Sequence, residues 1–226
     1  MKYENVKKAK FLSRPNRFIA NIELDGEVYV AHVKNTGRCR ELLVEGAEIY
    51  VQEFDSDTRK TKFDVITVKK GERLINMDSQ VPNQVFREWV ESEKFTENVT
   101  LIRPETFYGD SRFDFYIEAG HRKIFVEIKG VTLEEDGIVR FPDAPTERGV
   151  KHLRELMDAA EDGYEAHVVF IVQMDRVSHL EPNDATHPQF GQVLREAAQK
   201  GVLVTALCCR ITPDSIEAIR EIEVKL

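Results

Sequence analysis

The 226-residue chain lacks any apolar run of about 18 residues, the length that a membrane-spanning helix needs. Cysteine is scarce: Cys39 stands alone, and Cys208 and Cys209 are adjacent, so no zinc-type spacing is present. The chain also lacks repeats and low-complexity segments, and its first residues have no apolar stretch typical of a signal peptide. We therefore expect a cytoplasmic protein with no membrane contact and with small, buried cysteines.

The composition favours a globular chain, because 42% of the residues are hydrophobic. The net charge of −8 argues against a general nucleic-acid coat. This charge is uneven, since residues 1–82 are slightly basic and residues 83–226 are strongly acidic. Any contact with DNA must therefore come from local basic patches and bound metal.

Short alternating segments fill the first 80 residues and predict strands over 18–24, 27–33, 47–54, 62–68 and 73–77. Asp25-Gly26 between the first two is a typical hairpin turn. Five short strands in this length favour a small closed barrel such as an OB-fold, and an SH3-like barrel is the alternative.

The pattern changes near residue 82, where apolar residues at helical spacing predict a helix over 84–94 with Asn83 as its N-cap. Further helices are predicted over 147–162 and 189–200, and they alternate with apolar strands. We predict an α/β domain with a mixed sheet over 83–226, after an OB-like barrel domain over 1–82, so that the chain is α+β overall.

Residues 111–129 alternate around a Gly-His-Arg turn and predict a β-hairpin. Glu127 and Lys129 lie two apart on its second strand and share one face, which Asp114 on the first strand can reach. Two carboxylates and an ammonium suit phosphodiester cleavage with Mg²⁺ or Mn²⁺. Asp114 and Glu127 would be the metal ligands, and Lys129 would orient water or offset charge on the phosphate.

A solvated ion pair is the alternative for this Glu-x-Lys triplet, and Glu223 and Lys225 form a second triplet of the same kind. The apolar neighbours of Glu127 favour the metal site, because they indicate a buried strand, where a charge needs a partner or a metal.

The order of elements with Asp114, Glu127 and Lys129 on a hairpin resembles the PD-(D/E)xK restriction-endonuclease-like fold. In that superfamily a glutamate on the first helix often joins the metal site. The resemblance implies Glu88 as a third catalytic and metal-binding carboxylate, with Glu91 as its substitute. A solvated helix glutamate remains the alternative for both.

Longer phrases narrow the resemblance to the sugar fermentation stimulation protein A family. They are Asn35-Thr-Gly-Arg38, Tyr108-Gly-Asp-Ser-Arg112-Phe-Asp114, Val126-Glu-Ile-Lys-Gly-Val-Thr132 and Phe141-Pro-Asp-Ala-Pro-Thr146-Glu-Arg148-Gly-Val-Lys151-His152. The resemblance covers nearly the whole chain. It implies a DNA-binding protein with a barrel and a nuclease-like domain, but it brings no firmly assigned reaction.

Basic and polar residues in or near these phrases are candidate nucleic-acid contacts. Thr146 can cap the helix after it, and a helix N-terminus attracts phosphate. The candidates are Arg14, Arg17, Asn35, Arg38, Arg112, Arg148, Lys151 and His152. An ordinary capped helix, and a tight turn flanked by solvated arginines, are the alternatives.

Two functions remain open. The first is a metal-dependent nuclease acting on DNA, and the second is a non-catalytic DNA-binding or regulatory protein linked to sugar metabolism that keeps the nuclease fold. A carbohydrate or nucleotide sensor would need a pocket that the sequence does not reveal. A homodimer is compatible with all of these.

Overall fold

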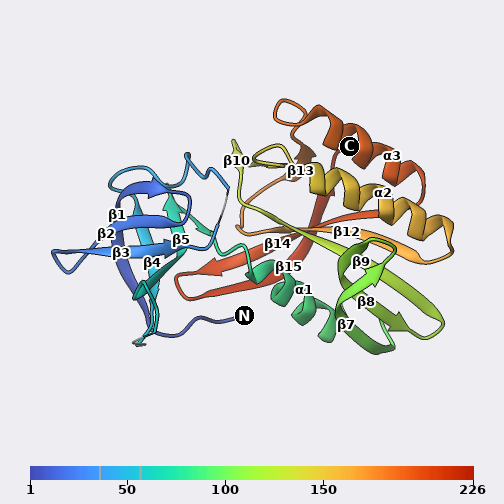
Figure 1. The fold of residues 1–226 in the computed structure, drawn as a ribbon, viewed down its shortest axis with the longest axis horizontal. Helices are drawn as coiled ribbons and strands as arrows, with labels where there is room; N and C mark the ends of the chain where they lie inside the picture. The colour runs from blue at the N-terminus through green and yellow to red at the C-terminus, as the bar shows by residue number, and fades with distance from the viewer. Residues whose placement is uncertain (36, 56–57) are drawn as a thin grey trace.

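The structure is a computed structural model that describes residues 1–35, 37–55 and 58–226. A barrel formed by the N-terminal residues lies beside a larger unit in which helices cover a long sheet (Figure 1). Over these ranges no helix is long and apolar enough to cross a membrane.

The barrel closes because the two strands at the ends of its five-stranded order pair with each other. Within the described ranges, five strands run in the order β3-β2-β1-β4-β5, and a parallel pairing of β3 with β5 closes them, with β6 added beside β5. This confirms the predicted five-stranded OB-like barrel. The strands are β1 (Val6–Asn16), β2 (Ile19–Leu24), β3 (Glu27–Val33), β4 (Glu48–Glu53), β5 (Phe63–Lys70) and β6 (Arg73–Asn76).

Strand β1 was not predicted from the sequence. Only Ala9 and Phe11 among its side chains are buried, and lysines occupy most of its first half. An apolar alternation with only two buried members is too short to separate from a loop.

The second unit is a mixed sheet in the order β10-β11-β13-β15-β14-β12-β9-β8-β7, as predicted for this part of the chain. Helix α1 packs on one face, and α2 and α3 pack on the other (Figure 1). The helices are α1 (Val81–Glu91), α2 (Glu147–Glu161) and α3 (Pro188–Gln199). The strands are β7 (Val99–Tyr108), β8 (Ser111–Ala119), β9 (Arg122–Val131), β10 (Glu134–Glu135), β11 (Ile138–Phe141), β12 (Glu165–Val172), β13 (His179–Pro182), β14 (Leu203–Thr212) and β15 (Ser215–Val224).

The two units are joined by buried polar contacts. The Gln173 amide, just after β12, donates to the main-chain oxygens of Asn76, at the end of β6, and Asp78, in the segment that follows. Main-chain pairing of Ile75 with Met174 extends this contact. Because these groups are buried and bonded, the barrel is held in a defined position against the sheet.

Helix α1 begins earlier than the sequence predicts. Gln80 is the residue at its N-cap, with no side-chain cap bond, and Pro82 lies in the first turn, where its missing N–H is not needed. The prediction that Asn83 caps this helix was wrong. Asn83 lies inside the first turn, and its side chain is free to make a distant contact.

Candidate metal and nucleic-acid site

Strand β9 carries Glu127 and Lys129 in the interior of the sheet. It runs antiparallel to β8 and parallel to β12, so both of its edges are occupied. Val126 and Ile128 belong to the core beneath α1. Since side chains alternate along a strand, Glu127 and Lys129 point to the opposite face, which α2 covers.

Glu127 is 3% exposed, and its two oxygens have different surroundings. Oε1 accepts from Lys129 Nζ at 2.5 Å and lies 2.5 Å from His152 Nδ1. Oε2 is buried and, in the part of the chain that the structure describes, meets no hydrogen-bond partner. A buried carboxylate oxygen without a partner is unfavourable, so Oε2 is a candidate position for a ligand.

Asp114 on β8 is held from two sides. Its Oδ2 accepts from the backbone N–H of Ile128 at 2.7 Å, and its Oδ1 accepts from Asn83 Nδ2 at 2.8 Å. Burial, and then the negative charge of Glu127, raise the pKa of Asp114. The two carboxylates therefore lie near enough to repel each other, as the hairpin predicts.

Burial opposes ionisation of Glu127 as well, but the hydrogen bond to His152 and the charge of Lys129 outweigh it. The pKa of Glu127 consequently lies below its usual range. An ionised Glu127 beside a carboxylate that resists ionisation is an arrangement in which added positive charge is favourable.

Asp114 and Glu127 offer oxygen ligands for a divalent cation, but they are too few to complete its coordination. The unpartnered Glu127 Oε2 supplies a hard oxygen, and Mg²⁺ commonly binds to one or two carboxylates while keeping several waters. Over residues 1–35, 37–55 and 58–226, however, no group of three or more His, Cys, Asp or Glu side chains is placed to hold a metal. Water or substrate oxygens would have to complete such a site.

The structure does not bring Glu88 to this site. Its carboxylate binds the amino group of Met1 at 2.6 Å and also accepts from Gln84. Glu91 pairs with Arg87 one turn earlier. The α1 residue that reaches the acidic pair is Asn83, so the expectation of a third carboxylate from Glu88 or Glu91 is corrected.

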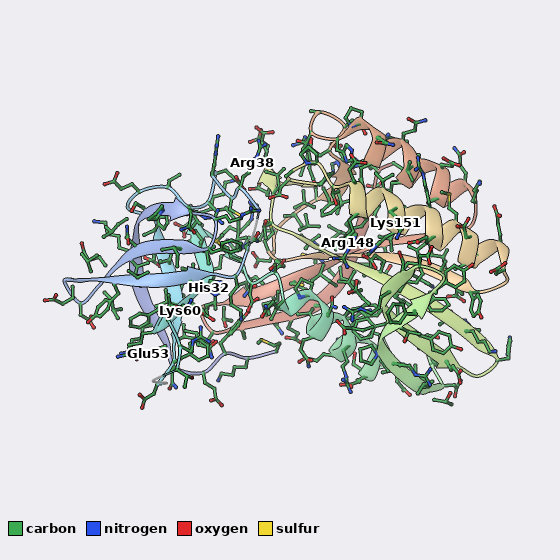
Figure 2. The ribbon with its side chains drawn as sticks, viewed as in Figure 1. His32, Arg38, Glu53, Lys60, Arg148 and Lys151 are labelled. Atoms are coloured by element: carbon green, nitrogen blue, oxygen red, sulfur yellow. The ribbon has the colours of Figure 1, made fainter. Side chains whose placement is uncertain are left out.

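The N-terminus of α2 is capped as predicted, because Thr146 Oγ1 accepts from the N–H of Gly149 at 3.1 Å. Arg148 and Lys151 are exposed on its first turns. Figure 2 shows both side chains on the part of α2 nearest the barrel. Lys151 forms an ion pair with Glu155, one turn further along.

His152 is not placed for contact with DNA. It is 5% exposed, its Nδ1 faces Glu127, and its Nε2 accepts from Arg148 Nε at 3.3 Å. No sequence signal predicts this contact, because His152 and Glu127 are 25 residues apart and on different elements.

The barrel loop after β3 is shaped by Arg14. Its Nη groups donate to the carbonyls of Arg17, Asn35, Gly37 and Arg38. Because these four bonds occupy the Nη hydrogens, Arg14 supports the loop instead of offering itself to DNA. Asn35 is also buried, and its Oδ1 accepts from Gly37 N.

Arg38 is exposed at the side of the barrel that faces the second unit (Figure 2). Arg17 lies over the exposed ring of Phe18, at 5.3 Å from its centroid. Arg112 pairs with Glu105 on the neighbouring strand. Thr36, in the same phrase as Arg38, lies outside the described residues.

Three of the recognisable phrases meet at the boundary between the units. A cleft of about 160 Å³ is lined by Asn35 and Gly37 of the barrel and by Gly130, Thr132 and Asp143 of the second unit, among others. A Cβ added to Gly37 would collide with the Asp143 carboxylate, so glycine permits this close approach. Residues far apart in the sequence thus form one surface beside the end of β9.

Barrel, sheet and acidic hairpin together define an OB domain joined to a restriction-endonuclease-like domain. Two family profiles match: one described as "Sugar fermentation stimulation protein RE domain" over residues 80–215, and one described as "SfsA N-terminal OB domain" over residues 12–77. The chain belongs to the sugar fermentation stimulation protein family, as the resemblance predicted.

Similarity to individual relatives supports the same family assignment. The chain is 60% identical to the sugar fermentation stimulation protein homolog of Desulfitobacterium hafniense over 100% of this chain and 99% of the relative. It is 57% identical to that of Clostridium beijerinckii over 96% of each chain. A solved structure described as Pyrococcus furiosus SfsA in complex with Ca²⁺ is 29% identical, with a TM-score of 0.90 over 100% of this chain and 98% of that one.

Proposed function

We propose that this protein binds DNA and cleaves phosphodiester bonds with a divalent cation, Mg²⁺ or Mn²⁺. The observation that carries the proposal is the buried, unpartnered Oε2 of Glu127 beside Asp114 and Lys129. Glu155 Oε2 is also buried without a partner in the described residues, but of the two glutamates Glu127 is the one that lies beside a second carboxylate whose pKa is raised by burial and then by the charge of Glu127. Support also comes from the Pyrococcus furiosus relative, which is described in complex with Ca²⁺.

Asp114 and Glu127 would hold the cation, and Asn83 and His152 would orient them. When bound, the cation would act as a Lewis acid and lower the pKa of a bound water. Lys129 Nζ lies on the same face as Glu127, where its positive charge can offset negative charge that develops on a phosphate.

The DNA would contact exposed basic residues on the two units that line the cleft. Arg38 on the barrel and Arg148 and Lys151 on α2 lie on the two units that meet there (Figure 2). A capped helix N-terminus adds positive potential beside Arg148. Because the protein as a whole is acidic, we expect binding to be local and strongly dependent on salt. DNA as substrate implies a cytoplasmic protein.

The test is cleavage of duplex, single-stranded and branched DNA with Mn²⁺, Mg²⁺ or no metal. We expect cleavage of at least one form with metal, and loss of that cleavage in Asp114→Asn and Glu127→Gln. These variants are nearly isosteric, so circular dichroism should show an unchanged fold. Equal cleavage by both variants would show that the activity does not come from this site.

The second candidate is a non-catalytic DNA-binding or regulatory protein linked to sugar metabolism. One observation favours it: Glu127 Oε1 is already occupied by Lys129 and His152, and over the described ranges no third carboxylate completes the site. DNA binding without cleavage under every metal condition would select this candidate. The homodimer stays a prediction, which light scattering can test.

A further inference from the structure

His152 lies between the basic start of α2 and the acidic pair of the hairpin. Its ring is buried, with Nδ1 2.5 Å from Glu127 Oε1 and Nε2 3.3 Å from Arg148 Nε. Arg148 is exposed, so one end of this chain of contacts faces solvent and the other ends at a buried carboxylate. The three side chains connect a candidate phosphate contact with the candidate metal ligand.

The contacts define the proton positions on the imidazole. Arginine only donates hydrogen bonds, so His152 Nε2 must accept from Arg148 and carries no hydrogen. In the neutral ring the proton is then on Nδ1, which donates to Glu127 Oε1. Arg148 therefore selects the tautomer that can hold Glu127, a role known for partners of site histidines.

A second buried histidine, His167, offers a comparison, although its own Nδ1 has no hydrogen-bond partner in the described residues. His167 is as deeply buried as His152, and its Nε2 contacts Glu165 Oε1 at 2.6 Å. Arg122 donates to both oxygens of Glu165, at 2.8 Å to Oε2 and 2.5 Å to Oε1. Glu165 therefore has no open oxygen, whereas the contact of His152 with Oε1 leaves Oε2 of Glu127 unpartnered in the described residues.

We propose that His152 is a positioning residue that holds Glu127 so that its Oε2 faces a divalent cation, and that Arg148 fixes the orientation and tautomer of His152. This inference rests on the proposed metal site. It implies that a change at His152 alters metal affinity although His152 does not touch the metal. Substitution of a hydrogen-bond partner of a metal ligand typically weakens metal affinity by about 10–100-fold.

The experiment is calorimetric titration of the full chain with Mn²⁺ alone. We expect His152→Ala to weaken Mn²⁺ binding by about 10–100-fold. His152→Asn, whose amide nitrogen can take the position of Nδ1, should recover most of that loss. His167→Asn is the matched control, equally buried and bonded to a glutamate, and should leave Mn²⁺ affinity unchanged.

A double variant tests whether Arg148 acts through His152. Arg148→Ala should weaken Mn²⁺ binding by a smaller factor than His152→Ala. It should add no further loss in the His152→Asn background, because asparagine has no ring nitrogen to accept from Arg148. An equal loss from Arg148→Ala in both backgrounds would show that Arg148 acts by its charge alone, and would overturn the tautomer step.

The outcomes separate this inference from the proposed function. If Glu127→Gln abolishes Mn²⁺ binding while His152→Ala binds as the wild type does, the metal site stands and the role of His152 is refuted. If the wild type binds no Mn²⁺, both fail together. If His152→Ala does not fold, His152→Asn decides: affinity near that of the wild type supports the inference, and affinity as weak as that of Glu127→Gln overturns it.

Discussion

Two buried glutamates, Glu134 and Glu127, differ in how completely their carboxylate oxygens are hydrogen-bonded. Glu134 lies where the second unit meets the barrel and is 5% exposed. Its Oε1 binds Arg73 at 2.7 Å and Gly137 N at 2.6 Å, and its Oε2 binds Lys70 at 2.9 Å. Glu127 is equally buried, but one of its oxygens has no partner in the described residues.

The pKa values reflect this difference. Burial of Glu134 favours its neutral form, but the hydrogen bonds from Lys70, Gly137 and Arg73 outweigh it and lower the pKa to about 2. Glu127 is also shifted below its usual range, while its neighbour Asp114 is shifted above it. The comparison indicates that Glu134 stabilises the contact between the units, and it supports the proposal that Glu127 binds a ligand.

The largest expected effect is on stability. Glu134→Ala leaves Lys70 and Arg73 partly buried without their counter-charge, and removal of one partner from a buried pair costs about 3–5 kcal/mol. Glu127→Gln also leaves Lys129 without its counter-charge, but it keeps the size of the side chain and an amide oxygen that can accept from Lys129, so we expect a smaller loss than for Glu134→Ala. Urea unfolding of both variants measures the difference. A larger loss for Glu127→Gln would reverse the assignment of roles.

The acid dependence of stability should follow Glu134. Its pKa is about 2 in the folded protein against an ordinary 4.5, so its full contribution is present above pH 4.5 and declines as the pH falls toward 2. A difference of this size corresponds to about 3 kcal/mol. Unfolding free energies of wild type and Glu134→Gln between pH 7 and pH 3 should therefore converge on acidification. Parallel curves would contradict the assignment.

Lys129→Met tests the proposed role of the site around Glu127. Methionine keeps the length of the side chain and removes its charge, and Lys129 is held against Glu127 on a central strand. If the protein cleaves DNA, turnover should fall about 100-fold, as for loss of a group that stabilises transition-state charge. DNA affinity, measured by fluorescence anisotropy, should stay close to that of the wild type. Turnover at the wild-type rate would show that the active site is elsewhere.

The smallest effects are expected at the exposed arginines. Arg38→Ala and Arg148→Ala should each weaken DNA binding and reduce the slope of log K against log salt by about one. Neither should change stability as Glu134→Ala does, because both side chains are exposed. Arg210→Ala is a control, since Arg210 is also exposed but pairs with Glu217 away from α2. If all three variants bind DNA equally, the exposed arginines of the barrel and of α2 are not the contact.

Local pattern determined much of this protein. The alternation in residues 18–33 gave the first barrel hairpin, because Ala20, Ile22 and Leu24 point into one core. The alternation around residue 120 gave the β8–β9 hairpin, and with it the grouping of Asp114, Glu127 and Lys129. Thr146 before an amphipathic segment gave the start of α2. These are contacts between near neighbours in the chain, and the spacing of apolar residues and the types of turn and cap residues encode them.

Only the tertiary structure decided which distant side chains complete the site. Asn83 instead of Glu88 reaches Asp114 because Pro82 lies in the first turn of α1 and the Glu88 carboxylate binds the Met1 amino group. His152 turns inward to Glu127 because α2 covers that face of β9. Spacing along the sequence does not specify how a helix is rotated on a sheet. That rotation follows from packing the whole core at once, and it determines which polar side chains meet.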